Sequence, residues 1–199
     1  MNNKIVFATN NTNKIREIKQ IIGGKFQILT LEDVGCFEDI PENQNTLVGN
    51  ALQKARYIYD KYKINSFADD TGLEVDCLNG MPGVYSARYA GEEQNSEKNI
   101  QKLLNELGDT SERTAKFRTI IALVLEDKDY FFEGVIEGTI AGEPKGENGF
   151  GYDPVFIPRG FDETFAEMPP EIKNKISHRL LVLEKLTGFL KNYNLSNSD

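Results

Sequence analysis

The stretch "SFADDTGLEVD", Ser66 to Asp76, places two adjacent aspartates after an apolar segment and starts the prediction of the fold. Its first residues are typical of a buried strand. Asp69 and Asp70 follow at the expected end of that strand, where an unpaired charge is costly to bury. From the residues alone they form either a turn before Gly72 or part of a metal site. As consecutive strand residues they would point to opposite faces.

Two predicted strands and two predicted helices precede this stretch. The apolar run at 4–9 predicts a strand, and "FQILTL" at 26–31 predicts a second one. Between them, Asn10 and Asn11 offer N-cap chemistry for a helix whose apolar face is Ile15, Ile18, Ile21 and Ile22 and whose end is Gly23-Gly24. A longer helix is predicted for about residues 46–62, where apolar side chains recur at helical spacing.

Strands and helices also alternate after the Ser66 to Asp76 stretch. The segment "SEKNIQKLLNELG" predicts a helix that glycine ends at 108. Two β-rich runs around the polar turn "DKD" predict a long hairpin, "DPVFIP" a short strand, and residues 177–193 an amphipathic helix that begins at Ser177. This alternation predicts one α/β domain with a mixed sheet.

Composition limits the class of protein. With 199 residues, 39% of them hydrophobic, the chain can bury the core of a globular domain. No apolar run approaches the roughly 20 residues of a membrane span. The apolar core of the N-terminal segment is too short for a secretory signal. Cys36 and Cys77 fit no metal spacing and predict reduced thiols in a cytoplasmic protein. The net charge of −8 argues against a nucleic acid partner.

Two loops offer candidate binding chemistry, each with an ordinary alternative. At a strand-to-helix turn, "TNNTNK" (9–14) could bind phosphate through free amides and Lys14, or could simply cap a helix. The loop "GENGFGYDP" (146–154) could let its backbone approach a flat ligand between Phe150 and Tyr152, or could be a plain connection.

Charged residues supply two further candidates. Glu42 adds a third carboxylate to the aspartate pair, and Mg²⁺ usually takes one or two carboxylates plus substrate phosphates. In "EIKNKISHR" (171–179), the single histidine and Arg179 fall in a first helical turn, where cations oppose the macrodipole. An anionic or keto-bearing ligand would explain that basic cluster, whereas a lone histidine is otherwise more often structural.

Together and in this order, these stretches resemble the inosine triphosphate pyrophosphatase family. The resemblance also covers "NALQKA" (50–55) and "GMPGVYSARYAG" (80–91), and thus nearly the whole chain. It implies an α/β fold with a long twisted mixed β-sheet, flanking helices and two lobes around a central cleft, as a single bilobed domain over residues 1–199 and a homodimer. The implied reaction converts ITP, dITP or XTP to the monophosphate and pyrophosphate, with Mg²⁺ as cofactor.

The resemblance also implies individual roles. Asp70 would be the proton acceptor and, with Glu42, a metal ligand, while Lys54 and Arg88 are further candidate substrate contacts. The 9–14 turn would hold the triphosphate, and the C-terminal residues the nucleoside. The residues expected to bind substrate are Thr9, Asn10, Asn11, Thr12, Asn13, Lys14, Thr71, Phe150, Gly151, Tyr152, Asp153, Lys173, His178 and Arg179.

The chain departs from the family pattern at Asn10, where glycine is usual. Asparagine tolerates the left-handed backbone region better than most residues, so the loop is expected to survive. Three alternatives stay open. A silent nucleotide-binding regulator is disfavoured by the intact acidic pair, and an RNA-binding module by the net charge; a Maf-like pyrophosphatase for modified or pyrimidine triphosphates would be separated by a substrate panel.

Overall fold

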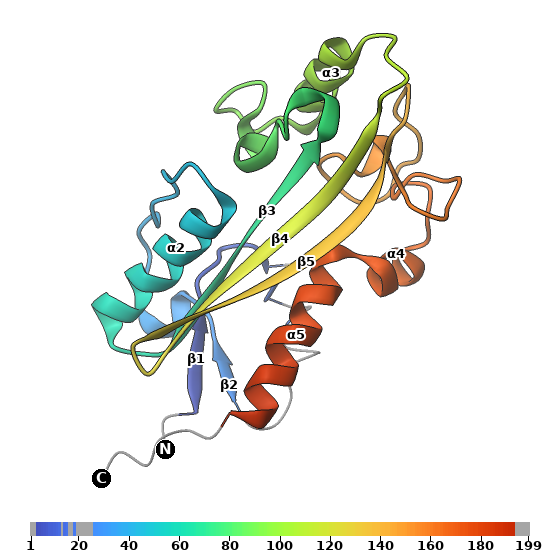
Figure 1. The fold of residues 1–199 in the computed structure, drawn as a ribbon. Coiled ribbons are helices and arrows are strands. Elements are labelled where there is room, and N and C mark those ends of the chain that lie inside the picture. Colours follow the sequence, from blue (N-terminus) through green and yellow to red (C-terminus); the bar gives the residue numbers. More distant parts are fainter. Residues whose placement is uncertain (1–2, 13, 16–17, 19–25, 194–199) are drawn as a thin grey trace. The chain divides into compact units, whose positions relative to one another are not determined.

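The structure is a computed structural model that describes residues 3–12, 14–15, 18 and 26–193. Within these residues six strands form one mixed sheet in the order β2-β1-β3-β4-β5-β6 (Figure 1). β1 pairs in parallel with β2 and β3, whereas β5 and β6 are antiparallel. The predicted α/β fold with a mixed sheet is thereby confirmed. The strands are β1 (Lys4–Phe7), β2 (Gln27–Leu29), β3 (Ser66–Val75), β4 (Thr114–Leu125), β5 (Lys128–Ile140) and β6 (Phe156–Pro158).

Helix starts and ends follow local capping chemistry. Thr46 Oγ1 accepts from Gly49 N–H at 3.0 Å, and Asn95 caps the next helix in the same way before Gly108 ends it. Ser177 Oγ accepts from Leu180 N–H at 3.2 Å, which confirms the predicted cap there. The helices are α2 (Leu47–Tyr62), α3 (Ser96–Leu107), α4 (Pro170–Ile176) and α5 (His178–Asn192), with short 3-10 turns η1 (Glu32–Val34), η2 (Asp76–Leu78), η3 (Gly83–Arg88) and η4 (Asp153–Val155).

The predicted first helix is described only in part. Thr12, Lys14, Ile15 and Ile18 are helical, and Ile18 is buried in the core, as its place on the apolar face predicted. Ile21, Ile22 and the Gly23-Gly24 end lie outside the described residues.

The chain divides into two compact units, each with its own hydrophobic core. The first comprises Met1–Asp70, Ile120–Glu133 and Val182–Asp199, and the second comprises Thr71–Thr119 and Gly134–Leu181. In the first unit, the rings of Phe7 and Phe67 stack at 4.5 Å and pack with the apolar side of α5. There α2 and α5 lie on opposite sides of the strands (Figure 1).

The core of the second unit is rich in aromatic rings. Phe117 stands 4.6 Å from Phe156 and 6.2 Å from Phe165, between ring centroids. Every second side chain of a strand points to the same side. Phe67 and Leu73 therefore lie on one side of β3, where Phe67 belongs to the first core and Leu73 to the second.

Three sequence-based boundaries are wrong. The aspartates do not end a strand: β3 continues through both to Val75, because each carboxylate finds polar partners inside the fold. The hairpin turns at Glu126 and Asp127, with φ of 51° and 62°, rather than at "DKD"; positive φ at both central residues matches the twist of paired strands. In "DPVFIP", Pro154 lacks an N–H, and only Phe156–Pro158 forms a strand.

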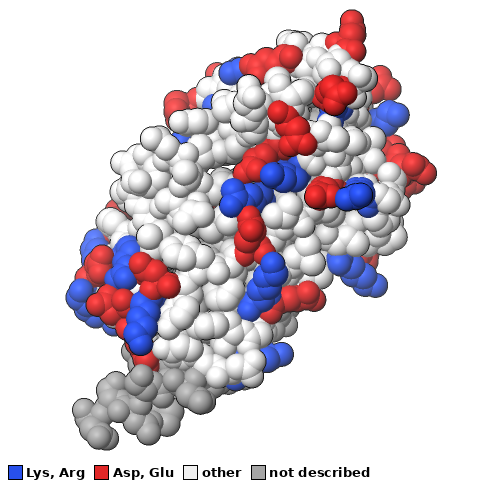
Figure 2. All heavy atoms as spheres, viewed as in Figure 1, with Lys and Arg blue, Asp and Glu red and all other residues white. Residues whose placement is uncertain are grey.

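Charge is distributed without a dominant sign on the face seen in Figure 2. Acidic and basic side chains are interspersed there rather than gathered into one basic surface. That the chain has no nucleic acid partner stays a prediction. In the ranges that the structure describes, no helix combines the length and the apolar character needed to cross a membrane.

Candidate active site

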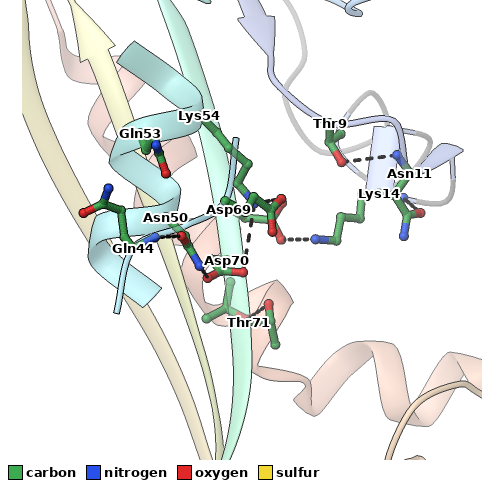
Figure 3. A network of polar contacts seen from close by, with 12 residues as sticks. Thr9, Asn11, Lys14, Gln44, Asn50, Gln53, Lys54, Asp69, Asp70 and Thr71 are labelled. Carbon is green, nitrogen blue, oxygen red and sulfur yellow. Dashed lines mark hydrogen bonds and ion pairs between the residues drawn. The ribbon is translucent and has the colours of Figure 1, made fainter. Parts of the chain in front are cut away.

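The 9–14 turn is organised by its own side chains. Thr9 Oγ1 accepts from Asn11 N–H at 3.2 Å, and Asn11 Oδ1 accepts from Lys14 N–H at 3.2 Å (Figure 3). Asn11 is therefore the helix cap that the sequence offered. Asn10 is not among the described residues that have a positive φ, so this turn requires no left-handed backbone at the position where the family has glycine.

Asp69 and Asp70 take their partners from different elements. Asp69 lies on the side of β3 that also carries Phe67, and its Oδ2 accepts from Lys14 Nζ at 2.6 Å. Asp70 Oδ2 instead accepts from Asn50 Nδ2 of α2, at 3.1 Å. The expectation that consecutive carboxylates point to opposite faces of the strand agrees with these contacts.

A buried ammonium lies between two carboxylates of this group. Lys54 Nζ is 2.7 Å from Glu42 Oε1 and 4.0 Å from Asp70 Oδ1. Burial acts to lower the pKa of Lys54, but the surrounding carboxylates, Asp70 first among them, outweigh burial and raise the pKa. Lys54 is therefore a cation over the physiological range of pH. Its position marks a place where the fold favours positive charge.

Burial controls the protonation of Asp70. It raises the pKa of Asp70 to about 6, although Lys54 and the hydrogen bond from Asn50 act to lower it. A carboxylate with such a pKa can accept a proton near neutral pH, as a general base must. The sequence could suggest this role only through the resemblance, whereas the packing gives its physical cause.

The oxygen atoms of this group suit a hard divalent cation. The side chain of Glu42 is 43% exposed and that of Asp70 is 15% exposed, so both remain accessible. No cluster of three or more His, Cys, Asp or Glu that could hold a metal by itself occurs in the described ranges. Two carboxylates on their own fit Mg²⁺, which completes its shell with water and substrate phosphates.

A second group of predicted residues forms around Asp153. Its buried Oδ2 accepts from Phe150 N–H at 2.7 Å and from Lys173 Nζ at 2.5 Å. The loop wraps closely around this carboxylate: Gly149 has φ of +80°, and a Cβ there would lie 2.2 Å from Asp153 Oδ2. Asp153 is thus a fixed point for both the aromatic loop and the lysine.

Two cations face the ring of Phe150, which is 58% exposed. Lys173 Nζ stands 5.1 Å from the ring centroid and Arg179 Cζ 5.4 Å from it. These are cation–π distances. The sequence predicted the basic cluster and the aromatic loop separately, and the structure brings them together.

Other predicted residues of this unit are packed more deeply. The His178 ring is buried and stacks on Phe117, with centroids 4.9 Å apart. Tyr152 OH donates to Ser86 O at 2.9 Å, and burial raises its pKa. Thr71 and Thr119 hydroxyls share a hydrogen bond of 2.8 Å.

Every predicted substrate residue but one is described, and each of these lies in one of the two compact units. Arg88 lies in the second unit, where its guanidinium is 5.3 Å from the Tyr85 ring. Thr9, Asn10, Asn11, Thr12 and Lys14 lie in the first unit, Thr71, Phe150, Gly151, Tyr152, Asp153, Lys173, His178 and Arg179 lie in the second, and Asn13 lies outside the described residues.

A carboxylate of raised pKa beside a buried ammonium, on an α/β sheet, suits an enzyme that must accept a proton and stabilise developing negative charge. The model of the Ham1 family matches residues 5–189, and the chain belongs to this family. The relationship predicted from the motifs is confirmed.

Relatives and solved structures agree with this assignment. The dITP/XTP pyrophosphatase of Flavobacterium johnsoniae is 54% identical over 187 residues, 94% of this chain and 97% of that protein. That of Porphyromonas gingivalis is also 54% identical, with the same coverage. The Ham1 protein of Staphylococcus aureus superposes with a TM-score of 0.89 at 41% identity, over 94% of this chain and 98% of that one. A HAM1 protein from Coxiella burnetii gives 0.91 at 38% identity, over 96% and 99%.

The raised pKa of Asp70 predicts a pH-dependent gain in stability for Asp70→Asn without metal. The folded protein binds this proton more tightly than the unfolded chain, so the wild type loses stability as pH rises from about 4 through about 6. Asparagine stays neutral. The variant should match the wild type near pH 4 and exceed it by about 2–3 kcal/mol near pH 7.5. Thermal unfolding in chelator would measure a Tm gain of roughly 5–10 °C.

Asp69→Asn provides the control for that experiment. It removes the partner of the largely buried Lys14 ammonium, so it should lower Tm rather than raise it. A Tm gain for Asp70→Asn that does not change between the two pH values would contradict the assigned cause.

Proposed function

We propose that this chain hydrolyses non-canonical purine nucleoside triphosphates, ITP, dITP and XTP, to the monophosphate and pyrophosphate. The observation that carries the proposal is the Asp70 carboxylate, whose pKa burial raises to about 6, packed beside Lys54 and Glu42. The names of the relatives, dITP/XTP pyrophosphatase, support the choice of substrate. The reaction cleanses the nucleotide pool, and the chain works as a homodimer of single bilobed domains in the cytoplasm.

Asp70 and Glu42 would hold Mg²⁺, which supplies neutralisation of charge on phosphoryl oxygens when bound. Asp70 has a second task. Its carboxylate orients the attacking water and accepts a proton from it. Lys54 keeps a positive charge beside both carboxylates and stabilises the negative charge of the transition state.

The turn at 9–14 would bind the triphosphate. An ammonium carries three N–H donors, so the contact with Asp69 does not exhaust Lys14. Asp69 holds that ammonium in one place, which spares the cost of ordering a long side chain when the substrate binds.

The group around Asp153 would bind the base. The exposed ring of Phe150 offers a face for stacking on a purine. The Arg179 guanidinium presents several N–H donors in a fixed fork, which suits the 6-keto oxygen of hypoxanthine or xanthine. The amino group of adenine would meet donor with donor, and such mismatches yield large discrimination.

Product analysis tests the reaction. Hydrolysis of ITP followed by ³¹P NMR should give the monophosphate and pyrophosphate from the first turnover. In H₂¹⁸O the label should enter the monophosphate, because water attacks the α-phosphorus. A diphosphate or orthophosphate as first product would refute the proposal. A panel that includes pyrimidine triphosphates separates it from a Maf-like activity.

A further inference from the structure

The buried side of α2 carries a polar side chain that the mechanism above does not use. Asn50 is 1% exposed and shares an apolar stripe with Ala51 and Ile58. A buried amide without partners is costly, and here both ends are bonded. Asn50 Oδ1 accepts from Gln44 N–H at 2.9 Å, and Asn50 Nδ2 donates to Asp70 Oδ2 at 3.1 Å. The side-chain amide of Asn50 thus joins the 42–44 segment to Asp70, the candidate general base.

The 42–44 segment is held against α2 at further points. Gln53 Nε2 donates to Asn43 Oδ1 at 2.8 Å, and Gln53 Oε1 accepts from Asn43 N–H at 3.2 Å. The backbone of the helix also comes very close, since a Cβ on Gly49 would lie 2.7 Å from Gln44 Cβ. The segment therefore has little freedom to move, and Glu42 begins it.

The hydrogen bond from Asn50 also determines which oxygen of Asp70 faces Lys54. Nδ2 of Asn50 holds Oδ2, so Oδ1 is the oxygen that faces Lys54 Nζ, at 4.0 Å. The same ammonium contacts Glu42 Oε1. The orientation of the Asp70 carboxylate toward Glu42 is thus tied to Asn50.

We propose that Asn50 is a positioning residue that fixes the Asp70 carboxylate relative to Glu42 and so prepares both for a divalent cation. The inference rests on the proposed role of these carboxylates as metal ligands. Asn50 brings no charge of its own and acts through hydrogen bonds alone. Partners of this kind orient ligands, and their loss typically costs 10–100-fold in metal affinity.

Binding of Mn²⁺ to the full-length protein without nucleotide, followed by EPR, tests the proposal. Asn50→Leu has nearly the same shape but makes neither hydrogen bond, and its Kd for Mn²⁺ should rise about 10- to 100-fold. Gln53→Met is the matched control, because it removes two hydrogen bonds to the same segment and none to Asp70. Its Kd should change much less. Equal weakening by both variants would overturn the specific role of Asn50.

A milder variant guards against misfolding. Asn50→Ser keeps a short polar group that cannot span both partners, and it should give a smaller rise in Kd. Activity provides a separate readout: at saturating Mg²⁺ both Asn50 variants should recover more of kcat than Asp70→Asn does. Wild-type Kd in both Asn50 variants would refute the inference.

Two further variants separate this inference from the proposed metal site. Glu42→Gln and Asp70→Asn should each bind Mn²⁺ far more weakly. If they bind it like the wild type, the metal site itself is wrong, and the role of Asn50 falls with it. If they lose Mn²⁺ while the Asn50 variants keep it, only the positioning role is wrong.

Discussion

Asp70→Asn should lower kcat for ITP by roughly 10²-fold or more at saturating Mg²⁺, the usual worth of a positioned general base. The substitution keeps the shape of the side chain and removes the charge that orients water. Asparagine can still accept the hydrogen bond from Asn50 through its oxygen, so the strand should remain intact. Steady-state kinetics with a pyrophosphate-release assay measures the loss.

Asp69→Asn supplies the comparison. Asp69 contacts Lys14 on the other face of the strand, so its loss should act on stability and on KM more than on kcat. Wild-type turnover in Asp70→Asn would contradict the assignment of the base. A larger loss of kcat in Asp69→Asn would reverse the two roles.

Arg179→Ala should lower kcat/KM for ITP and XTP about ten- to a hundredfold and leave ATP much less affected. The loss of one charge-assisted hydrogen bond costs on the order of 1.5–3 kcal/mol. Its position supports a contact with the base, because Cζ lies 5.4 Å from the centroid of the exposed Phe150 ring. Competition between ITP and ATP in one reaction would measure the change in preference.

Lys14→Met is the control for that prediction. A residue that grips phosphates should lower kcat/KM for all triphosphates by a similar factor, so the ratio of ITP to ATP should hold. If Arg179→Ala also leaves the ratio of ITP to ATP unchanged, the arginine binds phosphate, and its proposed contact with the purine base is wrong.

Features with local causes could be predicted from the sequence. The cap at Ser177 and the glycine end at Gly108 depend on residues within one helical turn, and the structure has both. The same holds for the order of the strands and of α2, α3 and α5, because apolar periodicity is a local signal. The short helix α4 was not predicted. The motifs likewise sufficed to predict the family.

Features with distant causes could not be predicted. The aspartates stay inside β3 because Lys14, 55 residues from Asp69, and Asn50 compensate for their burial. The raised pKa of Asp70 follows from packing that no motif encodes. Asn50 was missed, although a polar residue on the apolar stripe of α2, three positions after Leu47, was a usable sign.

The long hairpin has a consequence for how the gene can change. The same side of β4 supplies Phe117 to one core and Ile121, Leu123 and Leu125 to the other. Because side chains alternate with a period of two, one inserted codon between Phe117 and Ile121 would turn one set of these side chains out of its core. This part of β4 can therefore accept substitutions but not insertions or deletions of a single residue. Selection should remove insertions or deletions of one residue in this part of β4. Substitutions that conserve side-chain volume should be tolerated.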